Sequence, residues 1–186
     1  MTRDQATVAL SRPNTLHVIQ GEYAVSDDAN MVLCTLLGSC VSACIRDPQA
    51  GVGGLNHFLL PEGDGPAGNL SYGVNAMELL INDLLRRGAR RERLEAKLFG
   101  GARMIRSTTD IGAQNARFAE KFLEAEAIRF TGGSLGGDQA RRIEFWPVTG
   151  RVRQQLIEQD RTVFANELND RSAKPPKSDT GSLELF

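Results

Sequence analysis

The sequence predicts a single α+β domain, in which a sandwich of mixed and antiparallel β-sheet carries helices packed on it. Short apolar segments of strand character recur along the chain, and only two long stretches have helical periodicity. The chain has 186 residues, a size that fits one domain with its own core. Many strands with so few helices favour helices packed on a mixed sheet.

The first 60 residues predict four strands, at 15–19, 31–37, 40–46 and 52–60. The third has the period-two alternation of a strand, because Val41, Ala43 and Ile45 alternate with smaller, more polar residues. Gly38-Ser39 breaks the chain before this strand, and Asp47-Pro48 closes it as a turn. The fourth strand is expected to end at Pro61.

Two helices and four further strands are expected after a loop at 62–70. The first helix is predicted between Ser71, as N-cap, and Gly88, as terminator, and the second between Asp110, as N-cap, and Ala125. The remaining strands are expected at 94–99, 128–131, 142–148 and 151–157, of which the last two form a hairpin around Thr149-Gly150.

The two ends of the chain differ in composition from this domain, which is expected to span 14–165. Residues 1–13 are predicted to be a flexible lead. Residues 166–186 are polar, with the run Lys174-Pro175-Pro176-Lys177, and predict a disordered tail. The tail ends in Leu183-Glu184-Leu185-Phe186, which is apolar either by chance or because it is a short docking peptide.

Composition and charge exclude several classes of partner. The net charge is −1, so no overall field draws the chain to nucleic acid or to an anionic membrane. The N-terminus has no apolar segment typical of a signal peptide. The longest uncharged stretch, 29–45, is short and contains polar residues, so direct membrane insertion is not expected. A cytoplasmic location follows by elimination.

Three cysteines, Cys34, Cys40 and Cys44, lie within eleven residues, which suits reduced thiols better than a disulfide framework. No pair of cysteines or histidines has the spacing of a zinc site, so no metal is expected. The glycine pairs fit neither a dinucleotide fingerprint nor a P-loop. They predict turns where backbones approach closely, and no cofactor is expected.

Cys40 is the candidate nucleophile. It follows Gly38-Ser39, a small-residue turn whose N–H groups can form an oxyanion hole, and a nucleophile on a sharp turn beside a strand is a recurring arrangement. Such a thiol is expected to be exposed and partly ionised. The alternative is that Cys40 is a small core residue.

His57 is the candidate general base. The chain has only two histidines, and His17 lies in an early, more exposed segment. His57 lies in the apolar run 52–60, where an ionisable ring costs stability unless it is hydrogen-bonded. A hydrogen-bonded core histidine remains the simpler alternative.

These motifs together resemble the CheD family of chemoreceptor glutamine deamidases. The resemblance extends in order from Gly21 to Val152 and rests on five segments: 36–41 (Leu-Leu-Gly-Ser-Cys-Val), 56–61 (Asn-His-Phe-Leu-Leu-Pro), 97–102 (Lys-Leu-Phe-Gly-Gly-Ala), 111–115 and 142–150. It implies hydrolysis of a receptor glutamine to glutamate through a thioester, with Cys40 as nucleophile and His57 as base. Methyl-ester hydrolysis is also implied as a possible activity of such enzymes.

The resemblance leaves the third catalytic group open. The family has a threonine six positions before the cysteine, where this chain has Cys34, and Thr35 follows one residue later. Because one residue changes the face of a strand, Thr35, Cys34 or a backbone carbonyl could orient His57. Chemoreceptors are the implied substrates, and a CheC-type phosphatase is an implied partner.

Two other functions remain open from the sequence. One is a non-catalytic adaptor that docks to a receptor or to CheC, which the displaced threonine leaves open. The other, weaker, is a thiol redox sensor with Cys34 as resolving cysteine.

Overall fold

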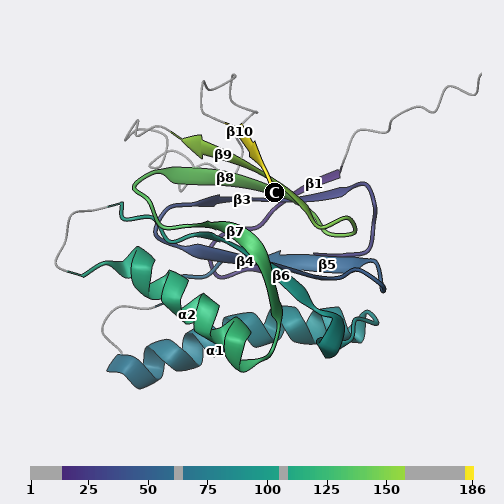
Figure 1. The fold of residues 1–186 in the computed structure, drawn as a ribbon, viewed down its shortest axis with the longest axis horizontal. Coiled ribbons are helices and arrows are strands. Elements are labelled where there is room, and N and C mark those ends of the chain that lie inside the picture. Colours follow the sequence, from purple (N-terminus) through teal and green to yellow (C-terminus); the bar gives the residue numbers. More distant parts are fainter. Residues whose placement is uncertain (1–13, 61–64, 105–108, 158–182) are drawn as a thin grey trace, which may run out of the picture.

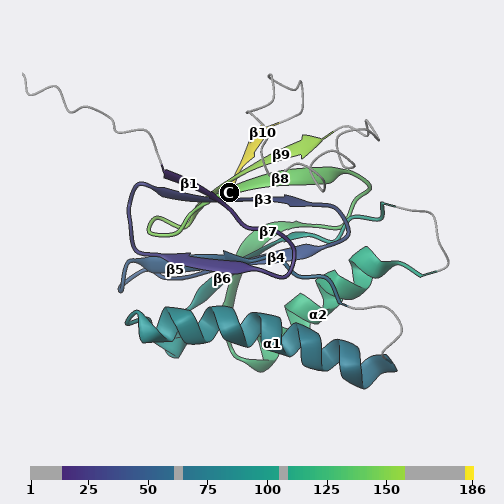
Figure 2. The ribbon, with the colours of Figure 1, turned by 180° about the vertical axis from the view of Figure 1, so that it is seen from behind.

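The computed structural model describes residues 14–60, 65–104, 109–157 and 183–186, which form three layers (Figures 1 and 2). Two five-stranded sheets face each other, and two long helices cover the outer face of the second sheet. The predicted α+β sandwich with helices packed on it is therefore confirmed. The elements are β1 (Asn14–His17), β2 (Tyr23–Ser26), β3 (Met31–Leu37), β4 (Val41–Asp47), β5 (Val52–Asn56), α1 (Gly65–Arg86), the 3-10 helix η1 (Arg91–Arg93), β6 (Glu95–Gly100), α2 (Ile111–Ala125), β7 (Arg129–Leu135), β8 (Ala140–Trp146), β9 (Arg151–Ile157) and β10 (Leu183–Leu185).

The first sheet has the strand order β1-β3-β8-β9-β10, and the second has the order β2-β5-β4-β6-β7. Two neighbouring pairs, β1 with β3 and β6 with β7, are parallel, and the other pairs are antiparallel. Both sheets are therefore mixed.

The alternation of β4 divides the core into two parts. Val41, Ala43 and Ile45 belong to the apolar cluster between the second sheet and the helices. Cys44, like Cys40 just before the strand, belongs to the cluster between the two sheets. The even-numbered residues of this segment therefore face the first sheet.

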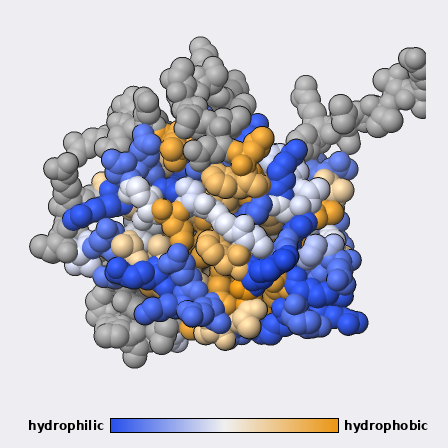
Figure 3. Space-filling view, in the orientation of Figure 1, coloured by the Kyte–Doolittle hydropathy of each residue, from blue (hydrophilic) through white to orange (hydrophobic). Residues whose placement is uncertain are grey.

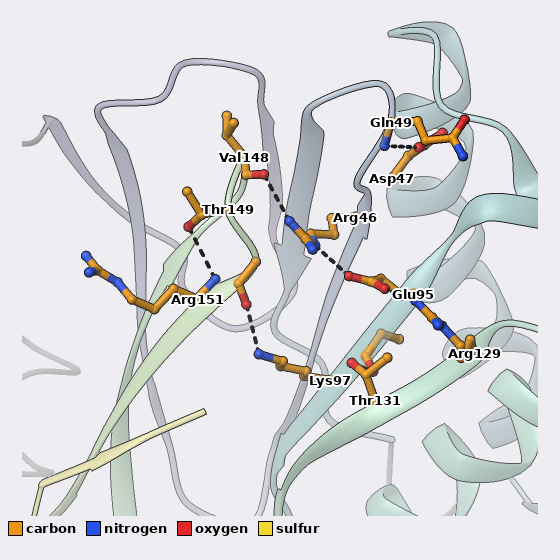
Figure 4. A network of polar contacts seen from close by, with 12 residues as sticks. Arg46, Asp47, Gln49, Glu95, Lys97, Arg129, Thr131, Val148, Thr149 and Arg151 are labelled. Atoms are coloured by element: carbon orange, nitrogen blue, oxygen red, sulfur yellow. Dashed lines mark hydrogen bonds and ion pairs between the residues drawn. The ribbon is translucent and has the colours of Figure 1, made fainter.

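A polar network ties the two sheets together at one end of β4 (Figure 4). The Arg46 guanidinium donates to Glu95 at 2.7 Å and to the carbonyl of Val148, in the β8–β9 turn, at 3.1 Å. Lys97 donates to the carbonyl of Gly150 in the same turn at 2.9 Å. Gly150 has φ of +72°, and a Cβ there would lie 2.3 Å from Arg46 Nε, so this turn requires glycine.

The second helix agrees with its prediction, and the first starts earlier. Asp110 caps α2 by accepting a hydrogen bond from the amide of Ala113 at 2.9 Å. The predicted start of the first helix at Ser71 is wrong, because α1 begins at Gly65. Pro66 lies in its first turn, where proline needs no N–H partner.

Several strand boundaries also differ from the predictions. β2 was not expected, and the strand predicted over 52–60 ends at Asn56. The lead at 1–13 and most of the predicted disordered tail, 158–182, lie outside the described residues. The last four residues differ from the predicted disordered tail, since their backbone pairs with β9.

Within the described residues, no helix has the length and apolar character needed to cross a membrane.

Candidate active site

Cys40 lies at the end of a turn whose three carbonyls each accept a hydrogen bond from another part of the chain. The Gly38 carbonyl accepts from the Ala102 amide at 2.9 Å, and the Cys40 carbonyl accepts from the Gly101 amide at 2.7 Å. The Ser39 carbonyl accepts from Asn115 Nδ2 at 2.8 Å. The turn is therefore fixed by the strand end of β6 and by α2.

The glycine pair at the end of β6 allows this approach. Gly100 has φ of +107°, and a Cβ there would lie 2.1 Å from the Cys40 carbonyl oxygen. A Cβ on Gly101 would lie 2.9 Å from the carbonyl of Gly112 in α2. The close backbone approach predicted for the glycine pairs is confirmed at this pair.

His57 lies just beyond β5 and next to the Cys40 turn. Val41 and Phe58 exchange two backbone hydrogen bonds, of 3.0 and 2.9 Å, which extend the pairing of β4 with β5. This register places His57 opposite Ser42, whose side chain shares a face with that of Cys40. The thiol and the imidazole therefore lie on the same face of neighbouring strands, toward the first sheet.

Asn115 joins the two segments that carry these groups. Besides donating to the Ser39 carbonyl, its Oδ1 accepts from the Leu60 amide at 2.9 Å. Its side chain is completely buried. One amide on α2 thus holds both the turn before Cys40 and the segment after His57, a role that sequence reasoning did not assign.

Thr35 reaches His57 from the first sheet. Its Oγ1 lies 2.9 Å from His57 Nδ1 and 2.8 Å from the carbonyl oxygen of Val18. The hydroxyl has one proton, and the carbonyl can only accept, so the hydroxyl donates to Val18 and accepts from Nδ1–H. This assigns the proton to Nδ1 and leaves a lone pair on Nε2.

The free lone pair of Nε2 suits a base. Nε2 is buried and has no hydrogen-bond partner among the described residues. Cys34 alternates with Thr35 along β3 and therefore leaves the strand on the opposite face. Of the two residues that sequence reasoning considered, Thr35 contacts the imidazole.

Burial keeps both the thiol and the imidazole neutral. Cys40 is 9% exposed, and burial raises the pKa of its thiol to about 11. His57 is 7% exposed, and burial lowers its pKa to about 4, against the opposing effect of the Val18 carbonyl. The expectation of an exposed, partly ionised thiol is therefore wrong for this structure. The Cys40 side chain points into the space between the two sheets, where it is buried.

Gln20 makes the one side-chain hydrogen bond described for the Cys40 thiol. Sγ lies 3.6 Å from Gln20 Oε1, and the thiol donates to this carboxamide oxygen. Gln20 is exposed and lies in the turn between β1 and β2. Sequence reasoning missed this residue, since only the placement of that turn brings it to the thiol.

The other predicted groups are less informative. All three cysteines are free thiols. Among the residues that the structure describes, no group of three or more His, Cys, Asp or Glu side chains is placed to hold a metal ion. His17, in β1, is exposed.

Comparisons with known sequences agree on one family. A sequence model described as CheD chemotactic sensory transduction matches residues 59–156. A protein of Acidiphilium cryptum is 53% identical over 92% of this chain and 93% of its own length, and one of Caulobacter vibrioides is 54% identical over 92% of each. Both are named "probable chemoreceptor glutamine deamidase CheD".

Among solved structures, a Neisseria meningitidis protein of the DUF152 family is 8% identical, with a TM-score of 0.46 over 68% of this chain and 64% of that one. The family match and the identities of more than half over nearly the whole length carry the assignment, and we conclude that the chain belongs to the CheD family.

Proposed function

We propose that this chain is a cysteine-dependent hydrolase that converts glutamine side chains of bacterial chemoreceptors to glutamate. The observation that carries the proposal is the hydrogen bond between Thr35 and His57 across the two sheets, on the face of the second sheet that also carries Cys40. The names of relatives more than half identical to this chain support the same reaction and substrate. The proposal places the reaction in chemotaxis adaptation.

In the proposed first step, Cys40 Sγ attacks the carbonyl carbon of the substrate carboxamide while His57 Nε2 takes the thiol proton. The tetrahedral intermediate collapses when the imidazolium gives that proton to the leaving nitrogen, which departs as ammonia. A thioester remains on Cys40. Water then attacks the thioester with His57 as base, and glutamate and the free thiol are formed.

Three contacts support these roles. Thr35 holds Nδ1–H and so keeps Nε2 as the basic nitrogen throughout the cycle. Hydrogen bonds from the strand end of β6 and from α2 to the carbonyls fix the orientation of the peptide groups in the Cys40 turn. A fixed turn supports the Ser39 and Cys40 amides as donors to the oxyanion. The contact between Cys40 and the Gln20 carboxamide supports a site that accommodates an amide oxygen at the sulfur.

The test is incubation with the purified cytoplasmic domain of a chemoreceptor from the same organism, followed by peptide mass mapping. Each deamidated glutamine gains about one dalton, because an amide becomes an acid. Cys40→Ala should abolish the gain. Cys44→Ala is the matched control, since Cys44 is a second buried thiol on the same face of β4, and this variant should retain activity. Activity in Cys40→Ala would contradict the proposal.

The raised pKa of the buried Cys40 thiol favours a second candidate, the non-catalytic adaptor that docks to a receptor or to a CheC-type partner. The two differ in the Cys40→Ala protein expressed in cells. An adaptor would keep normal chemotaxis with this substitution, whereas a deamidase would lose adaptation together with the mass change on the receptor.

A further inference from the structure

The last four residues complete the outer edge of the first sheet. β10 pairs antiparallel with β9, with Leu185 opposite Arg153. One residue further, Phe186 and Val152 exchange two backbone hydrogen bonds, of 3.1 and 3.0 Å. Since β8 lies on the other side of β9, these bonds satisfy backbone groups that an edge strand would otherwise leave open.

Phe186 anchors this segment to the core. Its ring meets that of Phe99 edge to face, with centroids 5.5 Å apart. Phe99 and Val152, which lies opposite Phe186, are both completely buried. Leu185 is 71% exposed, against 37% for Phe186, so neighbouring residues point to opposite sides of the sheet. Backbone pairing plus one side-chain anchor is the usual mode of strand addition by a peptide.

The contact is small, and its two sides belong to one chain. The pairing involves three residues of β10 and Phe186, and 25 residues, 158–182, separate it from the end of β9. Covalent connection within one chain raises the effective concentration of a peptide to the order of mM, so weak pairing suffices to keep it bound.

We propose that the outer edge of β9, with the Phe99 ring beside it, is a binding site for a C-terminal peptide strand that ends in an aromatic residue. The chain's own Leu183–Phe186, called the tail strand here, occupies the site and can detach from it. The occupant assigned is the tail strand of the same chain, because the backbone bonds and the ring contact are made in one molecule.

The site adjoins the candidate active site. Phe99 lies opposite Ser42 in the pairing of β6 with β4, and Ser42 lies opposite His57 by the register of β4 and β5. Phe99, Ser42 and His57 therefore form one row across the inner face of the second sheet. Hydrophobic surface gathers over the middle of the face where β7 and the chain end lie (Figure 3). Release of the tail strand would enlarge this surface by uncovering the neighbourhood of Phe99.

Two full-length variants test the proposal. Phe186→Asp places a charge against Phe99 and should release the tail strand, whereas Leu185→Asp, the matched control, places the same charge on the exposed side. Hydrogen exchange at the Val152 amide reports the bond to Phe186. We expect exchange at this amide to be at least tenfold faster in Phe186→Asp and unchanged in Leu185→Asp, with amides of β3 unaffected in both.

A fluorescein-labelled peptide of residues 180–186 then tests whether the vacated edge binds a strand. It should bind Phe186→Asp at least tenfold more tightly than Leu185→Asp, and a peptide ending in Asp should not bind. Equal exchange in the two variants, or no binding to Phe186→Asp, would overturn the proposal. If Phe186→Asp does not fold, judged by its melting curve, Phe186→Ala replaces it. If the Val152 amide of the unaltered chain lost its protection from exchange on dilution, the assignment of the tail strand to its own chain would be overturned. That result would indicate that tail strands are exchanged between copies of the protein.

Discussion

Alkylation of Cys40 by iodoacetamide is expected to be slow at neutral pH and to accelerate steadily as the pH rises. The thiolate is the reacting form, and burial raises the pKa of the Cys40 thiol to about 11. At pH 7 the thiolate fraction of such a thiol is on the order of one in ten thousand, and it grows tenfold with each pH unit. We therefore expect about a hundredfold increase in rate between pH 7 and pH 9.

The structure also argues against a preformed thiolate–imidazolium pair. Burial holds the pKa of His57 at about 4, about seven units below that of Cys40. Moving the proton from the thiol to the imidazole then costs on the order of 10 kcal/mol before the attraction between the two charges is counted. His57 should therefore take the proton only as the sulfur attacks a substrate.

The assay is partial alkylation from pH 6 to pH 9, with the modified cysteine identified by fragment-ion mass spectrometry. Cys44 serves as an internal reference, because burial raises its pKa to about 12. His57→Gln should give the same pH dependence as the unaltered chain. The reasoning would be refuted if the alkylation rate of the unaltered chain were constant between pH 6 and pH 8 and that of His57→Gln were not. Such a result would reveal a thiolate–imidazolium ion pair.

Three further predictions concern the groups around the thiol. Thr35→Val should lower the deamidation rate about 10- to 100-fold, since the buried Nδ1–H loses its acceptor at a cost of about 1–3 kcal/mol, and Thr35→Ser should restore it in an ammonia-release assay. The free energy of unfolding should fall by about 3 kcal/mol as the pH drops from 6.5 to about 4, because in this range the unfolded chain protonates His57 and the folded chain does not; urea titrations of His57→Gln should lack this part of the loss. Gln20→Ala should make Cys40 react several-fold faster with iodoacetamide at pH 8, because it removes the side chain that accepts from the thiol; an unchanged rate would mean that Gln20 does not cover the sulfur in solution.

Local patterns in the sequence predicted much of the framework around the site. The alternation around Cys40 and Val41 indicated a strand with two different faces, and both faces are buried in separate clusters. The Asp110 cap and the spacing after it located α2 within one residue. The glycine pair at Gly100-Gly101 indicated close backbone approach, since few other residues tolerate such geometry. These features depend on neighbours in the chain.

Features that depend on distant segments could not be predicted in the same way. Thr35 contacts His57 because the two sheets stack face to face, and no spacing in the sequence encodes that stacking. The burial of Cys40 and its contact with Gln20 have the same origin. The polar composition of 166–186 predicted disorder up to the chain end, and the place where its apolar end docks could not be predicted, because the contact of Phe186 with Phe99 joins positions 87 residues apart.

The two hydrogen bonds of Asn115, to the Ser39 carbonyl and the Leu60 amide, couple the site to movements of α2. If α2 moved, the turn before Cys40 and the segment after His57 would move with it. The distance between the sulfur and the imidazole would then change little. Thr35 stays behind on the other sheet. A sliding movement between the two sheets would therefore weaken the hydrogen bond from His57 Nδ1 to Thr35, which fixes the tautomer, before it changed the distance between Cys40 and His57.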